Sequence, residues 1–211
     1  GTQPVLGTNP FAFSAPAGKY PPLVLDFATT VAAVNKVKVR NLREIDLPVG
    51  WVNDGQGNPI TNPNDALKIF ENRDNGGLNP VGGMGTALGG HKGYGLAVFS
   101  HILSGVMSGA SFSPIRVKNA NQDTPDDLGH FFQAINPESF RPIEDYYRDL
   151  EIVIETLKNV KPSDPNDPVL IPGEPEQITR KNRIKYGIPI NKNLRSIIEE
   201  IADNAEVEYL F

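Results

Sequence analysis

The chain has 211 residues, of which 39% are hydrophobic and 21% charged, and its formal net charge is −5. This balance is typical of a globular protein, and an acidic total without a basic stripe argues against nucleic acid as a partner. The absence of cysteine excludes disulfides, thiolate metal ligands and a cysteine nucleophile. No apolar run is long enough for a membrane span, so we expect no membrane partner. The lack of cysteine is compatible with the cytosol, and we expect a cytoplasmic location.

The first half of the chain predicts short strands separated by turns. A loop over residues 4–10 leads into a strand at Phe11–Ala15, and an apolar run predicts a second strand over Leu23–Ala28. Apolar residues at helical spacing indicate a helix within Val31–Arg40. Residues 61–90 are rich in glycine and turn-forming residues. They predict a long loop, which in a compact domain is often functional.

The second half predicts mainly helices. The clearest helix covers residues 95–110, and because its other faces are also apolar or small we expect it to be well buried. His130–Ile135 predicts a strand, and Val169–Glu174 predicts a short strand that ends in a turn. Amphipathic helices are expected over Ile143–Leu157 and Leu194–Ala205.

The most informative stretch is Leu88–Leu96, which holds four glycines beside His91 and Lys92. Glycines allow backbone amides to approach a ligand closely, and a helix N-terminus presents free N–H groups with a partial positive charge. A lysine is unfavourable there unless something negative binds, so the stretch predicts a phosphate site. The alternative is a solvated helix start with a glycine-rich turn. The spacing Gly83-x-Gly85-x-x-x-Gly89 resembles a nucleotide fingerprint, but no strong strand precedes it and the predicted helix begins too late, which argues against a Rossmann loop. No Gly-Lys-Ser/Thr occurs, which excludes a P-loop.

Two further positions have competing interpretations. Asp26, at the end of a predicted strand, either orients a ribose hydroxyl or a catalytic histidine, or caps the following helix, a role that Thr29 or Thr30 could also fill. Gly173–Pro175 predicts a plain turn, with closure over a cofactor as the alternative. The histidines are too scattered for a metal site, and none is expected.

Several short motifs follow one another along the whole chain. They are Gly7–Phe13, Val24–Thr30, Gly50-Trp51, Gly55–Pro59, Thr61–Pro63, Gly89–Leu96, Ser104–Ala110, Gly129–Phe132 and Pro172–Glu174. In this order they resemble the type-2 malate/L-lactate dehydrogenase family, whose relatives include sulfolactate, ureidoglycolate and diketogulonate oxidoreductases and a cyclic-imine reductase.

The resemblance implies an α+β fold. A largely antiparallel mixed sheet with packed helices would form an NAD(P)-binding domain, not of the Rossmann type, over residues 1–172. Residues 173–211 would form a C-terminal helical segment. The implied reaction is hydride transfer between NAD or NADP and a small 2-hydroxy or 2-oxo acid of the malate or lactate type, in a homodimer.

The resemblance also implies site residues. Thr8 is expected near the substrate, and Asp26 is expected to support the general acid/base. The implied cofactor contacts are Asp26, Phe27, Ala28, Thr29, Thr30, His91, Lys92, Gly173, Glu174 and Pro175.

One departure from the family pattern limits these expectations. Family members carry a further segment before the Gly7–Pro10 motif, with the acid/base histidine and an arginine for the substrate carboxylate, and neither has a match here. We therefore expect this chain to be the C-terminal two-thirds of the enzyme, with residues 173–211 packing on the missing part. A cofactor-binding fragment without activity of its own, and a phosphate-ligand protein of unrelated fold, remain alternatives.

Overall fold

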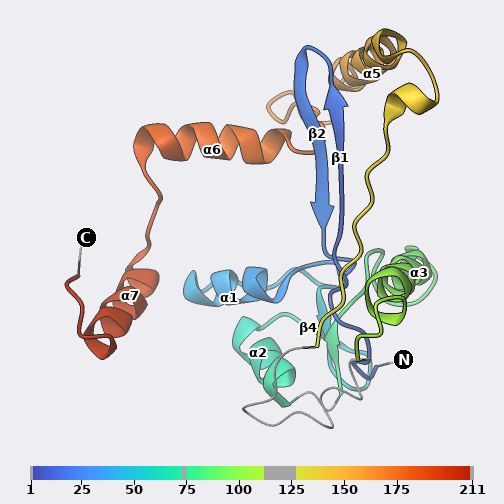
Figure 1. Cartoon of the computed structure of the whole chain (residues 1–211). Helices are drawn as coiled ribbons and strands as arrows, with labels where there is room; N and C mark the ends of the chain where they lie inside the picture. Colours follow the sequence, from blue (N-terminus) through green and yellow to red (C-terminus); the bar gives the residue numbers. More distant parts are fainter. Residues whose placement is uncertain (1, 73–74, 112–126, 210–211) are drawn as a thin grey trace. The chain divides into compact units, whose positions relative to one another are not determined.

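The computed structural model describes residues 2–72, 75–111 and 127–209, which form two compact units (Figure 1). Unit 1 draws on Gly1–Pro10, Ala28–Phe131 and Pro189–Phe211, and unit 2 draws on Phe11–Phe27 and Phe132–Ile188. Of the helices in these described stretches, none has the length and apolar character of a membrane span.

Unit 2 is built on an antiparallel hairpin of β1 (Phe11–Ala17) and β2 (Tyr20–Phe27). The register pairs Phe11 with Phe27 and shifts by a bulge after Ala15, before a tight turn at Gly18 with φ 59°. Successive strand residues point to opposite faces, so Ala15 and Ala17 are buried together on one face. The strands predicted at Phe11–Ala15 and Leu23–Ala28 are confirmed.

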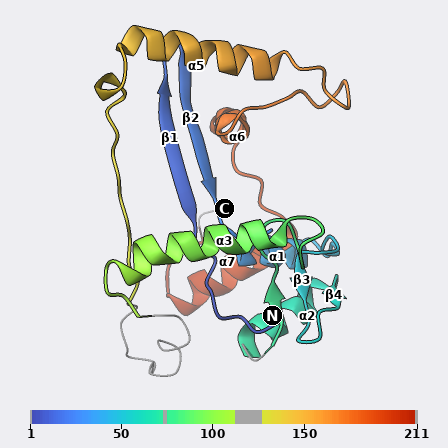
Figure 2. The ribbon, with the colours of Figure 1, turned by 90° about the vertical axis from the view of Figure 1, so that its right-hand side faces the viewer.

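Helix α5 (Ile143–Lys158) packs at the turn end of this hairpin (Figure 2). Its Ile154 is fully buried in a small core with Ala17 and Ile171. Acidic residues occupy its first turn and Lys158 its last, which suits the helix dipole. The predicted amphipathic helix is confirmed. The remaining elements of unit 2 are a short 3₁₀ helix, η2 (Pro137–Ser139), and α6 (Glu174–Tyr186).

Unit 1 contains a small antiparallel sheet in the order β4-β3-β5, covered by two helices. Its elements are α1 (Val34–Leu42), β3 (Val52–Asn53), β4 (Pro59–Ile60), α2 (Pro63–Asn72) and β5 (Gly77–Leu78). The core of this part is formed by Val37, Leu47, Val52 and Ala66. The Asn62 side chain accepts hydrogen bonds from the Asn64 and Asp65 amides, 2.9 and 3.1 Å away, and so caps α2.

Unit 1 also contains α3 (Gly90–His101), which continues as the π-helical turn η1 (Ile102–Val106), and α7 (Lys192–Asn204). Asn191 caps α7 through the Leu194 amide at 2.8 Å, and Asn193 Nδ2 donates to the Leu42 carbonyl of α1 at 2.6 Å. The predicted final helix is confirmed.

Several predicted elements are wrong in detail. Residues 130–135 and 169–173 form no strand, and residues 61–90 contain α2 and β5 within what was expected to be loop. The helix expected over 95–110 begins at Gly90 and is not well buried. Its small residues Gly90, Gly93, Ala97 and Ser100 face the interior instead.

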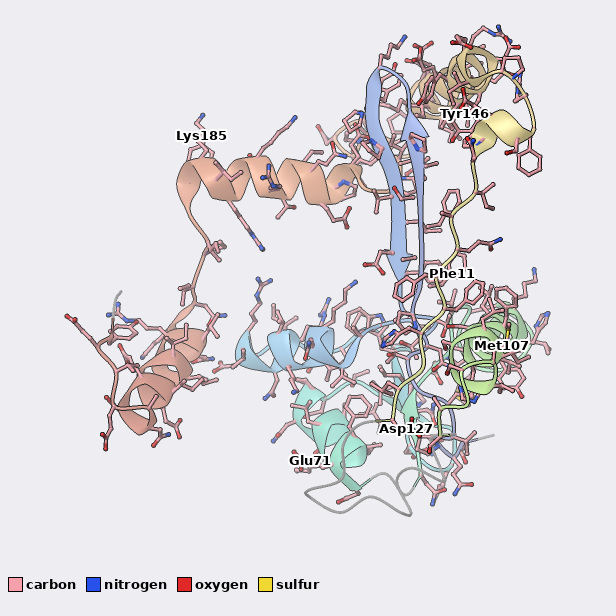
Figure 3. All side chains as sticks on the ribbon, in the orientation of Figure 1. Phe11, Glu71, Met107, Asp127, Tyr146 and Lys185 are labelled. Carbon is pink, nitrogen blue, oxygen red and sulfur yellow. The ribbon has the colours of Figure 1, made fainter. Side chains whose placement is uncertain are left out.

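The apolar side chains of this helix are exposed in the described chain. Phe99 is 49% exposed, and Met107, labelled beyond η1 in Figure 3, is 66% exposed. Every strand pair among the described residues is antiparallel, and helices pack beside the strands, so the mixed helix-and-sheet class is confirmed.

Candidate functional site

Thr29 connects two loops of unit 1. It is 1% exposed, and both its amide and its Oγ1 donate to the Thr8 carbonyl at 2.9 Å, with Asn9 O a second acceptor for Oγ1 at 3.2 Å. Its own carbonyl accepts a hydrogen bond from the Val81 amide at 2.9 Å. Buried polar groups must be paired to avoid a desolvation cost, so Thr29 fixes both loops.

The loop around Thr8 is also fixed to α3. Asn9 adopts a left-handed backbone with φ 37°, and its Nδ2 donates to the Ala97 carbonyl at 2.9 Å. Ser100 Oγ donates to the Pro10 carbonyl at 3.2 Å. The structure therefore joins three predicted site segments of unit 1: Thr8, the strand exit at 28–30, and the helix that carries Lys92.

Glycines explain how the first turn of α3 is seated. A Cβ at Gly90 would lie 1.9 Å from the Gly83 carbonyl oxygen, and a Cβ at Gly93 would lie 2.1 Å from the Val81 carbonyl oxygen. The loop Val81–Gly85 thus packs backbone to backbone on this turn. Two of the four glycines predicted to approach a ligand instead approach the protein's own loop, whereas a Cβ at Gly95 would meet nothing within 4 Å.

His91 and Lys92 lie in the first turn of α3 and are exposed to solvent. The helix has no acidic residue in that turn, and Lys92 takes part in none of the ion pairs between described residues. Like charge at the positive end of a helix dipole is unfavourable. An anion bound at this turn would relieve that conflict and would meet both an ammonium group and open helix amides.

The side-chain amides of Asn53 and Asn79 form a buried pair, and Asn79 comes shortly before the loop Val81–Gly85. Asn53 and Asn79 are both buried, and Asn53 Nδ2 donates to Asn79 Oδ1 at 2.6 Å. Asn53 Oδ1 is buried without a partner among the described residues. An unpaired buried acceptor of this kind costs roughly 1–3 kcal/mol. Neither asparagine was singled out from the sequence, because a long-range amide contact leaves no local signal.

The remaining predicted site residues belong to unit 2. Asp26 and Phe27 lie at the end of β2, where Asp26 is exposed and the Phe27 ring centroid is 6.0 Å from that of Phe11. Gly173 has φ 92° and precedes α6, and the Val24 amide donates to the Pro172 carbonyl at 3.2 Å. Strand β2 and the turn at 172–175 are therefore neighbours, and Pro175 is exposed in the first turn of α6.

The capping alternative for Asp26 is wrong. Helix α1 begins after Ala33, with no side-chain cap. Thr29 Oγ1 is used by the loop at 8–9, and Thr30 Oγ1 donates to the Ala32 carbonyl at 2.8 Å, so neither threonine caps the helix.

Glu174 stabilises the turn that precedes α6. It forms an ion pair with Lys158, and its Oε2 accepts a hydrogen bond from the Ile171 amide at 3.2 Å. The hydrogen bond from Lys158 holds the pKa of the Glu174 carboxyl below its usual value. These contacts fasten the turn in front of α6, a role the sequence did not predict. Among the described residues no group of side chains could hold a metal ion.

A sequence model of one family, described as malate/L-lactate dehydrogenase, matches residues 1–199. The chain belongs to this family. Malate dehydrogenase of Pyrococcus horikoshii is 38% identical over 210 residues, covering 100% of this chain and 56% of its own length. Malate/(S)-sulfolactate dehydrogenase of Methanothermus fervidus is 34% identical over 208 residues, covering 99% and 56%.

Solved structures agree with this membership of the malate/L-lactate dehydrogenase family. Malate dehydrogenase from Entamoeba histolytica superposes with a TM-score of 0.89 at 28% identity, covering 100% of this chain and 58% of that one. The Pyrococcus horikoshii enzyme gives a TM-score of 0.77 at 33% identity, covering 100% and 54%. The chain thus spans a little over half the length of the relatives it matches.

Thr29→Val tests the connection between the two loops of this family member. The change keeps the shape of the side chain but removes the hydroxyl, and we expect it to lower the free energy of unfolding by about 1 kcal/mol. Urea denaturation measures the effect. Thr179→Val, at an exposed position on α6, is the matched control and is expected to change little. Equal effects of the two changes would contradict the role given to Thr29.

Glu174→Gln tests the fastening of α6. A carboxyl whose pKa is lower in the folded than in the unfolded state stabilises the fold above its unfolded pKa, and this stability is lost as the pH falls. We expect the wild-type protein to lose stability below about pH 5, and the variant to show a flatter dependence there. Thermal melts across that range provide the measurement. Glu176→Gln, an exposed neighbour in the same turn, should retain the wild-type slope.

Proposed function

We propose that the protein is an oxidoreductase that transfers a hydride between NAD or NADP and a small 2-hydroxy or 2-oxo acid. Membership of the malate/L-lactate dehydrogenase family supports this, as do relatives named malate and sulfolactate dehydrogenases. A substrate of the malate, lactate or sulfolactate type follows from those names. We further propose that residues 1–172 form an NAD(P)-binding domain of a type other than Rossmann, that 173–211 form a helical segment, and that the enzyme is a cytoplasmic homodimer.

The observation that carries the proposal is Lys92 in the first turn of α3, which forms no ion pair with another described residue. A dinucleotide brings a pyrophosphate, and the donors at this turn, an exposed ammonium group and helix amides, fit an anion. In the neighbouring loop, a Cβ at Gly83 or Gly85 would meet nothing within 4 Å. When bound, the nicotinamide ring supplies or accepts the hydride.

Each predicted residue has a role in this proposal. Lys92 and His91 bind the anionic part of the cofactor, and the strand exit at 28–30 supports its ribose and nicotinamide side. Thr8, held by Thr29, lies towards the substrate. In unit 2, Asp26, Phe27 and Gly173–Pro175 contribute to the nicotinamide side, with Asp26 supporting the proton donor.

Two titrations test the function. Binding of NADH and of NADPH to the purified protein is followed by nicotinamide fluorescence, and turnover is then measured with oxaloacetate, pyruvate and sulfopyruvate. Tight binding of one reduced cofactor and consumption of at least one acid are expected. Binding without turnover supports the second candidate, a cofactor-binding fragment without activity of its own. No binding of either cofactor refutes both.

Hydrogen exchange tests whether both groups of residues take part. With saturating reduced cofactor, the amides at 90–93 and those of Ile171, Gly173 and Glu174 are both expected to become more protected. Protection at only one of the two segments would remove the other from the proposed site.

A further inference from the structure

The buried side-chain amides of Asn53 and Asn79 hold the chain shortly before the loop Val81–Gly85. Asn53 on β3 is 7% exposed and Asn79 is 2% exposed. Asn53 Nδ2 donates to Asn79 Oδ1 at 2.6 Å, and Asn79 Nδ2 donates in turn to the Gly50 carbonyl at 2.8 Å. The direction of this relay is fixed, because reversing the Asn79 amide would set donor against donor and acceptor against acceptor.

The backbone of Asn79 is held as firmly as its side chain. Its amide donates to the Trp51 carbonyl at 2.9 Å, and its carbonyl accepts from the Val31 amide at 2.8 Å. Pro80 then forms a β-bridge with Thr30. The backbone amide, the carbonyl, Nδ2 and Oδ1 of Asn79 therefore each have a hydrogen-bond partner, and together these bonds fix where the following loop starts.

That loop seats the first turn of α3. Gly93 lies against the backbone of Val81, and Gly90 lies against the carbonyl of Gly83, both too closely for a Cβ. A shift of Asn79 is therefore expected to move the backbone on which the turn rests, although the Thr29 carbonyl also holds the Val81 amide at 2.9 Å. The same turn carries Lys92 and the Gly90 and His91 amides, the first two of the helix.

We propose that Asn79 is a positioning residue, which sets through Val81–Gly85 the place of the α3 first turn and of the Lys92 ammonium group. The anion that this turn would receive is the one given by the proposed function, on which the inference rests. The unpaired Asn53 Oδ1 supports it. Stability alone would favour a side chain without an orphan acceptor, and the orphan results from directing Nδ2 at Asn79 Oδ1, 2.6 Å away, and at the Gly77 carbonyl, 3.3 Å away.

Asn79→Ala, compared with Asn62→Ala, tests the proposal. Asn62 caps α2 in the same unit, so its loss lowers stability without touching the loop. For Asn79→Ala we expect amide exchange over residues 81–93 of the cofactor-free protein to accelerate about tenfold, and the dissociation constant of the reduced cofactor to rise about tenfold. For Asn62→Ala we expect a lower melting temperature, with exchange over 81–93 and cofactor affinity both unchanged.

The outcomes separate positioning from general stability. Unchanged exchange in Asn79→Ala overturns the proposal, and so does an equal loss of cofactor affinity in both variants. If Asn79→Ala does not fold, Asn53→Ala replaces it, since that change keeps the Asn79 bond to Gly50, and the same two shifts are expected. A wild-type protein that binds no cofactor contradicts the proposed function, while the exchange comparison still decides the role of Asn79.

Discussion

Lys92→Ala is expected to weaken binding of the reduced nicotinamide cofactor roughly 10- to 100-fold, because a hydrogen bond to a charged group contributes about 1.5–3 kcal/mol. The stability of the fold is expected to increase although binding weakens. Removing a cation from the positive end of α3 raises the free energy of unfolding by about 0.3–1 kcal/mol. Fluorescence titration and urea denaturation of the same preparation measure the two effects.

Lys36→Ala is the matched control, since Lys36 is an exposed lysine on α1 of the same unit. It is expected to leave cofactor affinity unchanged, which separates a local contact from a loss of overall positive charge. A Lys92 variant with wild-type affinity would remove this residue from the site. Equal weakening by both changes would reduce its role to long-range attraction.

Gly93→Ala is expected to destabilise the protein by about 1–3 kcal/mol or more, whereas Gly95→Ala is expected to stabilise it by about 0.5–1 kcal/mol. Both glycines lie in α3, two residues apart. A methyl group at Gly93 would lie 2.1 Å from the Val81 carbonyl oxygen, but at Gly95 it would meet open space. Alanine otherwise favours a helix over glycine equally at both positions.

Equilibrium unfolding of the two variants compares the signs directly. A neutral Gly93→Ala would mean that the loop Val81–Gly85 does not pack on the helix as described. A destabilising Gly95→Ala would mean that this position also packs closely. Cofactor titration of Gly93→Ala adds a second readout, because displacement of the loop is expected to disturb the first turn and weaken binding.

The pattern of apolar residues predicted those elements in which the spacing of the apolar residues matches the face that is buried. Helix α5 is an example, because its apolar residues recur at helical spacing around the buried Ile154. Helix α6 was not predicted from its residues, since it is dense in charge, including Arg180 and Arg183, and buries none of its side chains. The start of α3 was placed five residues too late, because glycines at 90 and 93 have poor helix propensity and are explained only by the loop packed on them.

The two false strands fail for lack of a partner. Residues 130–135 have strand-like composition, but none of the described strands pairs with them. Residues 169–174 are apolar at first, but Glu174 turns back to bind the Ile171 amide, which ends any extended run. A strand requires a neighbouring strand, and the sequence does not say where that neighbour is.

For the candidate site, local reasoning identified the charged helix start but not what holds it. The conflict between Lys92 and the helix dipole is visible in the sequence. The contacts of Thr29 with Thr8 and of Asn53 with Asn79 join residues more than twenty positions apart, and such contacts appear only in the folded chain. Asn9 offered one clue, because asparagine tolerates a left-handed backbone better than most residues.

The interrupted course of the chain affects how the protein can be made. Unit 2 contains no residue after Ile188. During synthesis on the ribosome, its last piece therefore emerges before the third piece of unit 1, Pro189–Phe211, has been made. That third piece includes α7, whose Asn193 side chain donates a hydrogen bond to the carbonyl of Leu42, 151 residues earlier in the chain. A nascent chain halted at residue 188 would thus hold all the pieces of unit 2 but lack the third piece of unit 1, the unit that carries Lys92.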